Sequence, residues 1–305
     1  MPFLILPVLF VPIGIAVAIN DGFFNATYAI LTLIGVVSLH MSVNVLNDYF
    51  DYKNGIDIAT TPTPFSGGSR MLPEKLLTSN NVLTAGIILL ALGSGIGSYI
   101  AYQLNFPVTL VAIIAIAIIS VVGYSKVFAA LGLGEIIVAL NFGPLLTVGT
   151  YYVQAQSIST TSIYIGLITG LLTAGILYIN QFPDTTADIS KGRNHLVARL
   201  GKKKAVTGFK IIIILAYVIL AIGVITRILP VLTILGLLTI PKSRTTFKLL
   251  DRNYEEIEKL IPAMGNNVKT TIITSSLILV GYAITLIFAY WGFQFTPYIG
   301  GGSVS

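Results

Sequence analysis

The sequence has 305 residues, of which 55% are hydrophobic and only 10% are charged. A soluble domain carries about 25% charged residues, so this composition excludes an ordinary soluble protein and predicts an all-α protein that crosses a membrane several times. The absence of cysteine excludes disulfides, thiolate metal sites and thiol catalysis. The net charge of +6 lies in short loops between apolar segments. There it suits membrane lipids or a phosphorylated substrate, and we expect no nucleic-acid partner.

Apolar runs recur from one end of the chain to the other and predict about nine transmembrane helices. Lys and Arg gather in the loops after every second span, and the positive-inside rule places those loops and the N-terminus in the cytoplasm. Nine spans then put the C-terminal tail, residues 300–305, outside the cell membrane. The predicted spans are 3–19, 26–46, 81–103, 107–123, 135–154, 161–181, 205–226, 228–241 and 270–291.

Polar side chains gather where the second span ends. Asn44, Asn47 and Asp51 recur at helical spacing and therefore lie on one face of a helix. Asp48 lies at the edge of that face, and Asp57 follows in a looser stretch. Because Mg²⁺ prefers carboxylate, phosphate and water oxygens, this set predicts a magnesium site formed by Asp48, Asp51 and Asp57.

The segment 60–70 is rich in Pro, Gly, Ser and Thr and predicts a loop. Gly67 and Gly68 leave backbone N–H groups free to approach an anion, and Arg70 can form a bidentate contact with phosphate. A plain solvated turn that caps a helix explains the same residues, and this alternative stays open. Further along, Tyr124 and Lys126 end the fourth span on the same side. Tyr124 suits either substrate orientation or the interfacial aromatic belt.

The polar pattern of the second span returns at the end of the sixth. Residues 47–51 and 180–184 both follow the pattern Asn-x-aromatic-x-Asp, starting at Asn47 and Asn180. Asp188 follows Asp184 by one helical turn. The repetition predicts two halves of one site. It also suggests a single domain, 1–305, with pseudo-repeats at about 1–125 and 135–241 and a last helix at 270–291.

Basic residues follow the second pair of acids closely. Lys191 and Arg193 come within five residues of Asp188. Acids that bind a metal and bases that bind the remaining oxygens together suit a metal-bridged polyanion. In a membrane protein that polyanion is best explained as a lipid diphosphate. Mg²⁺ would then stabilise the departing pyrophosphate, and a dry cavity lined by aromatic side chains would shield an allylic carbocation.

These strings resemble the UbiA-type intramembrane prenyltransferase superfamily, and most closely its menaquinone branch, which prenylates 1,4-dihydroxy-2-naphthoate. The resemblance rests on residues 47–57, 67–70, 134–135, 141–152 and 184–193. It implies a central cavity and a Mg²⁺ cofactor. It also implies metal binding by Asp48, Asp51, Asp57, Asp184 and Asp188. By the same resemblance, Asp51, Asp184, Asp188 and Tyr124 act in catalysis, and Asn44, Asn47, Arg70, Lys126, Asn180, Lys191 and Arg193 bind substrate.

We therefore expect a Mg²⁺-dependent transfer of a prenyl group, from geranyl to geranylgeranyl or longer, to an aromatic quinone precursor at the cytoplasmic side of the membrane. Geranylgeranylglyceryl phosphate and 4-hydroxybenzoate remain alternative acceptors. A cation-coupled transporter with a site between its repeats is the alternative from another class.

Overall fold

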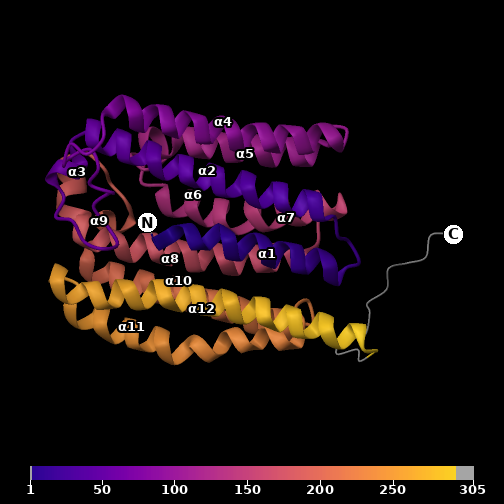
Figure 1. The fold of residues 1–305 in the computed structure, drawn as a ribbon. Helices are drawn as coiled ribbons and strands as arrows, with labels where there is room; N and C mark the ends of the chain where they lie inside the picture. Colours follow the sequence, from indigo (N-terminus) through magenta and orange to yellow (C-terminus); the bar gives the residue numbers. More distant parts are fainter. Residues whose placement is uncertain (1, 293–305) are drawn as a thin grey trace.

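The computed structural model describes residues 2–292, and in that range the chain is helical without a strand. The long helices run side by side along one axis (Figure 1). Seven of them are long and apolar enough to cross a membrane, and a shorter apolar helix, Ile5–Asn20, packs among them. The predicted all-α membrane fold is confirmed. The count of nine spans stays a prediction, and the predicted outer tail, residues 300–305, lies outside the described residues.

The α-helices, labelled as in Figure 1, are separated by short 3₁₀ and π segments, labelled η. In chain order the elements are η1 Pro2–Leu4, α1 Ile5–Asn20, α2 Ala26–Lys53, α3 Ile56–Ala59, α4 Ser79–Gln103, α5 Val108–Gly123, η2 Tyr124–Phe128, α6 Gly134–Leu140, η3 Asn141–Leu145, α7 Leu146–Ala155, α8 Thr160–Ser190, α9 Leu196–Leu200, α10 Lys202–Ile225, η4 Val231–Thr239, α11 Ile240–Asn253 and α12 Ile257–Tyr290.

Two helices continue past the ends that hydropathy predicts, and both carry the polar motifs. Helix α2 extends to Lys53 and helix α8 to Ser190, so the acids of both motifs lie on regular helix rather than in loops. Side-chain caps fix their starts: Asn25 accepts the Tyr28 N–H at 3.0 Å, and Ser159 accepts the Thr161 N–H at 3.2 Å. Both helices therefore present their acids at the same end of the bundle.

The predicted span 135–154 corresponds to the candidate membrane segment Gly134–Ala155. This segment is not a regular α-helix along its whole length. The chain there forms α6, a π-helical segment η3 and α7, with Gly143 at φ −104° and ψ −111° and Pro144 next to it. Proline removes a backbone donor and clashes with the preceding turn, which breaks the helix. Glycines on α8 leave room for the irregular backbone of this segment, because a Cβ on Gly170 would lie 2.3 Å from the Ala139 carbonyl oxygen.

The predicted short span 228–241 likewise differs in form. Its residues form the 3₁₀ helix η4, which continues directly into α11. A buried hydrogen-bond chain ties this segment to its neighbours: the Tyr217 hydroxyl lies 2.8 Å from both Thr239 and Ser243. The main apolar core lies here, between α1, α8, α10 and α12. Residues of α2, α4, α5, α6 and α8 line a cavity.

Candidate active site

The cavity lined by α2, α4, α5, α6 and α8 has a volume of about 1010 Å³. One end is polar and is lined by side chains at the ends of α2 and α8 and by the loop 63–69. The other end is apolar and reaches Leu31, near the start of α2. Twenty residues of helix separate Leu31 from Asp51, which corresponds to about 30 Å at 1.5 Å per residue. The cavity thus joins a charged head region to a long apolar channel.

At the polar end, the acid of the first motif meets a base from the second half of the chain. Both guanidinium nitrogens of Arg193 donate to the carboxylate of Asp51, one of them at 3.1 Å. The side-chain amide of Asn47 donates to the same carboxylate at 2.9 Å, and Ser125 donates to Oδ1 of Asn47 at 2.8 Å. These contacts bring α2, η2 and the segment after α8 to one point, so the predicted meeting of the two halves is present at Asp51 and Arg193.

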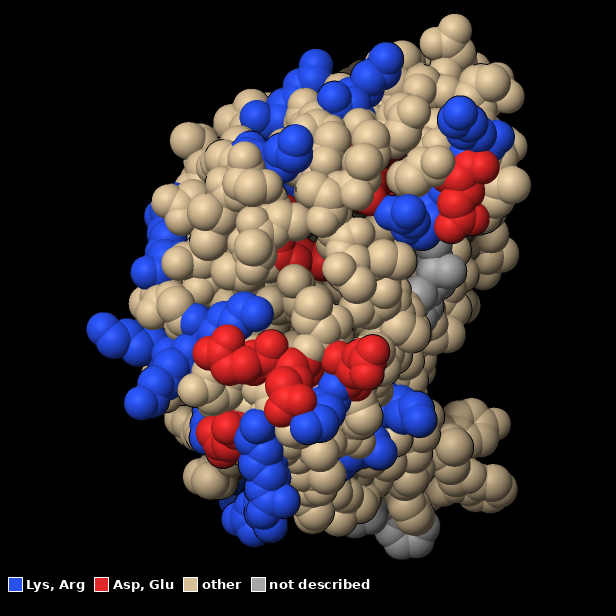
Figure 2. Space-filling model, turned by 90° about the vertical axis from the view of Figure 1, so that its left-hand side faces the viewer, with Lys and Arg blue, Asp and Glu red and all other residues tan. Residues whose placement is uncertain are grey.

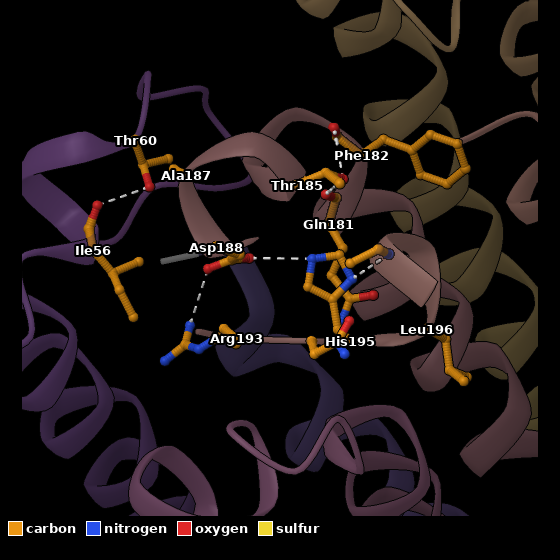
Figure 3. Close-up of polar contacts among 12 residues, drawn as sticks. Ile56, Thr60, Gln181, Phe182, Thr185, Ala187, Asp188, Arg193, His195 and Leu196 are labelled. Carbon is orange, nitrogen blue, oxygen red and sulfur yellow. Dashed lines mark hydrogen bonds and ion pairs between the residues drawn. The ribbon is translucent and has the colours of Figure 1, made fainter. Parts of the chain in front are cut away.

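The second motif reaches the same base. Arg193 Nη1 lies 3.6 Å from Oδ1 of Asp188, and His195 Nε2 lies 3.3 Å from Oδ2. Figure 3 shows the Asp188 carboxylate between the Arg193 guanidinium and the His195 ring. Arg193 therefore bridges the two acid motifs. The pKa of its guanidinium, which burial alone would lower, is raised chiefly by the charges of Asp51 and Asp188.

The glycine-rich loop lies over the first cluster. The Ser69 N–H donates to Asp48 at 3.3 Å, and a Cβ on Gly68 would lie 2.8 Å from both carboxylate oxygens of Asp57. Gly67 and Gly68 have φ values of +89° and +72°, which glycine adopts without strain. Burial, together with the charges of the nearby acids, raises the pKa of Asp57 to about 7. A cation beside Asp57 would favour its ionised form.

The donor set fits a divalent cation. In the part of the chain that the structure describes, the cavity lining contains five carboxylates but only one arginine, Arg193. The carboxylates are those of Asp48, Asp51, Asp57, Asp184 and Asp188. Among the described residues, the Oδ1 atoms of Asp184 and Asp188 are buried without a hydrogen-bond partner, and the one on Asp188 has Arg193 at an ion-pair distance of 3.6 Å. Buried anionic oxygens of this kind are normally paired or bound to a metal. Nevertheless, no three acidic or His side chains in 2–292 are grouped as a ready-made metal site. A cation would therefore draw on phosphate and water oxygens as well.

The predicted substrate contacts Asn44, Tyr124 and Asn180 also line the cavity. Asn44 donates to the His40 carbonyl oxygen at 2.7 Å, which fixes its amide group. Oδ1 of Asn180 is buried without a hydrogen-bond partner in the described part of the chain. These three residues supply polar groups just inside the charged end, where the head region meets the apolar channel.

Three predicted bases lie beside the site rather than on the cavity wall. Arg70 donates to the Asp57 backbone oxygen at 2.5 Å, and Lys126 lies 4.7 Å from the centre of the Phe50 ring. Lys191 approaches Gly55, where a Cβ would lie 3.4 Å from its Nζ. Their roles in substrate binding stay predictions. Viewed end-on, Lys and Arg ring this end of the bundle, and acidic atoms are visible in a hollow between them (Figure 2).

Sequence reasoning gave neither His195 nor Glu135 a place in the site, although residues 134–135 are among those that carry the family resemblance. The pattern groups His195 with a basic run, but the side chain is buried and faces Asp188. Glu135, at the start of α6, accepts the Leu196 N–H at 3.0 Å and so holds the segment after α8. The only signal in the sequence is the short distance from Asp188 to His195 across the Gly192 turn.

The chain belongs to the UbiA prenyltransferase family, whose model matches residues 5–268. The predicted resemblance to this family is thereby confirmed. The family model covers the helices that carry both acid motifs and most of the cavity wall. It thus describes the same part of the molecule that the geometry singles out.

Several characterised relatives act on naphthoate-type compounds by name. The chain is 33% identical to the 1,4-dihydroxy-2-naphthoate octaprenyltransferase of Haemophilus influenzae, over 61% of each chain. It is 29% identical to the Escherichia coli protein of that name, over 63% of this chain and 64% of the relative. The 2-carboxy-1,4-naphthoquinone phytyltransferase of Synechocystis is 27% identical, over 82% and 80%. The match spans less than two thirds of the first two relatives.

Two solved structures share the fold. An apo UbiA homolog from Aeropyrum pernix superimposes with a TM-score of 0.62 and 16% identity, covering 90% of this chain and 97% of that one. A UbiA homolog from Archaeoglobus fulgidus, bound to DMAPP and Mg²⁺, gives 0.53 and 14%, covering 91% and 98%. At this identity the two structures establish the fold alone.

Proposed function

We propose that this protein is a Mg²⁺-dependent prenyltransferase that moves a polyprenyl group from its diphosphate to an aromatic quinone precursor. The observation that carries the proposal is the bridge of Arg193 between Asp51 and Asp188, at the charged end of a cavity with a long apolar channel. An amphiphile with an anionic head and a long apolar tail matches this division of polarity. The Archaeoglobus homolog, which binds DMAPP and Mg²⁺, supports the same class of substrate.

In this mechanism the side chains of the site bind the metal ion and the diphosphate and orient the substrate. Asp48, Asp51, Asp57, Asp184 and Asp188 would hold Mg²⁺, which stabilises the negative charge that develops on departing pyrophosphate. Arg193 lies between the motifs, within reach of a diphosphate, and would bind it through bidentate hydrogen bonds. Basic groups at Arg70, Lys126 and Lys191 would add to the positive field around the entrance.

The allylic C–O bond would then break, with its electron pair leaving on the pyrophosphate oxygen. Tyr124 lies at the junction of head region and channel, and its ring would face the resulting cation. Apolar walls exclude water from that cation. The acceptor's ring carbon would form the new C–C bond and afterwards lose its proton.

The relatives named for naphthoate substrates favour the menaquinone-type acceptor over 4-hydroxybenzoate or geranylgeranylglyceryl phosphate. Purified protein supplied with each acceptor and with prenyl diphosphates of graded length would identify both substrates. We expect prenylated 1,4-dihydroxy-2-naphthoate as the main product. A main product from another acceptor would contradict the naphthoate assignment but would leave the proposed class of reaction, prenyl transfer, unchanged.

Two single substitutions, Asp51→Ala and Asp184→Ala, test the proposed reaction. Each removes an acid of one motif, and we expect each to abolish most pyrophosphate release and product formation. The matched control is Asp251→Ala, an exposed acid on α11 that pairs with Lys210 and does not line the cavity. Wild-type transfer in either site variant would refute the proposal. Cation-dependent uptake into vesicles without pyrophosphate release would favour a transporter instead.

A further inference from the structure

The structure assigns a positioning role to His195, which lies at the start of α9. In this role, the His195 side chain orients the Asp188 carboxylate within the site. This inference rests on the proposed function, because the value of orienting Asp188 depends on its binding a metal. His195 is only 3% exposed, so its ring is fixed by its neighbours rather than by solvent. It lies on the segment that also carries Arg193, between α8 and α9.

The two nitrogen atoms of the ring have different neighbours: Nδ1 is hydrogen-bonded, and Nε2 is at ion-pair distance from Asp188 without hydrogen-bond geometry. Nδ1 accepts the Ala198 N–H at 3.2 Å, which makes His195 the N-cap of α9. In the neutral ring the proton is then on Nε2, the nitrogen that lies 3.3 Å from Oδ2 of Asp188. The other oxygen of Asp188, Oδ1, lies 3.6 Å from Arg193, so His195 and Arg193 face different oxygens of the same carboxylate.

The segment cannot turn away easily, because residues 131–135, at and before the start of α6, hold it. Glu135 accepts the Leu196 N–H at 3.0 Å, and Arg199 donates to the Leu131 carbonyl oxygen at 2.5 Å. Gly132 lets the two segments approach, since a Cβ there would lie 2.2 Å from the Asn194 carbonyl oxygen. The segment that carries His195 is therefore held in place. A carboxylate that contacts a fixed side chain such as His195 loses less conformational freedom when it binds a cation. Substitution of such a neighbouring side chain typically weakens metal binding 10- to 100-fold.

The two functions of the ring are separable by substitution. Asn is a good N-cap residue, so His195→Asn keeps an acceptor for the Ala198 N–H, but its short amide lacks the nitrogen that faces Asp188. The readout is Mn²⁺ binding, followed by electron paramagnetic resonance in the presence of an unreactive prenyl thiodiphosphate. Melting temperatures of the same samples report on folding. Asn194→Ala, an exposed neighbour, is the control.

We expect His195→Asn to bind Mn²⁺ about 10- to 100-fold more weakly than the wild type at an unchanged melting temperature, and Asn194→Ala to bind as the wild type does. Wild-type affinity in His195→Asn would overturn the inference, and so would an equal loss in Asn194→Ala. If His195→Asn does not fold, His195→Ser, another N-cap residue, gives the same test. Absence of Mn²⁺ binding in the wild type would instead refute the proposed function, and the inference with it.

Discussion

At the residue scale, the arrangement of the site depends on a few positions that tolerate no other side chain. Gly68 combines a left-handed backbone, φ +72°, with direct contact to the Asp57 carboxylate. Gly22 has a similar backbone, φ +90°, but a Cβ there would meet no atom within 4 Å. Substituting Gly68 and Gly22 in parallel therefore distinguishes the effect of backbone strain from the effect of contact with the Asp57 carboxylate.

We predict that Gly68→Ala raises the KM for prenyl diphosphate several-fold, because the new Cβ displaces the loop or the Asp57 carboxylate. Gly22→Ala should leave the KM unchanged. Both variants should lose about 1–2 kcal/mol of unfolding free energy from the left-handed backbone. Steady-state kinetics and unfolding in detergent measure the two effects. An equal KM in both variants would show that the loop does not touch the substrate site.

Several site residues could be predicted from sequence because they share a helix. The spacing of Asn47 and Asp51 fixes their common face, and helix α8 carries Asp184 and Asp188 on one face although Pro183 stands beside them. The partner of Asp188 could not be predicted. His195 reaches it only because the Gly192 turn, at φ +77°, reverses the chain, and a turn of this kind leaves no periodic pattern.

At the element scale, the packing of α8 against the broken segment 134–155 shapes the wall of the cavity. Gly166 and Gly170 allow backbone contact with Gly143 and Pro144, where a Cβ on Gly166 would lie 2.9 Å from the Pro144 Cα. Hydropathy predicts one apolar span here, because it does not register a local break in the backbone. The break is set by Pro144 and by the absence of side chains on the opposing helix.

We predict that Gly170→Ala lowers the unfolding free energy by about 1–3 kcal/mol, because its Cβ overlaps the Ala139 carbonyl and forces the helices apart. The matched control is Gly95→Ala on α4, where a Cβ would meet nothing within 4 Å. That exchange should be neutral or should stabilise by up to about 1 kcal/mol through helix propensity. Thermal unfolding in detergent would measure both. Equal stability of the two variants would contradict the close packing.

At the scale of the whole molecule, composition and hydropathy predict the class of fold correctly, because burial in lipid requires long apolar helices with all backbone groups bonded. They do not predict the cavity, which results from how α2, α4, α5 and α6 pack against one another. The acids of both motifs lie at one end of the bundle, and we propose from the positive-inside rule that this end faces the cytoplasm.

The absence of cysteine from the sequence allows a direct test of this orientation. Ala130→Cys places a thiol in the exposed loop at the acidic end, and Thr160→Cys places one at the exposed start of α8 at the other end. In intact cells, a membrane-impermeant maleimide should label Thr160→Cys and should label Ala130→Cys only after the cells are opened. The opposite pattern would reverse the proposed topology.

The central claim is that the two acid motifs bind one diphosphate while its tail fills the apolar channel. A structure with Mg²⁺ and an unreactive prenyl thiodiphosphate tests it most directly. We predict that the diphosphate lies between Asp51 and Asp184, with metal ligands from both helices, and that the tail runs along α2 toward Leu31. A diphosphate held by one motif alone, or a tail outside the cavity, would contradict the account.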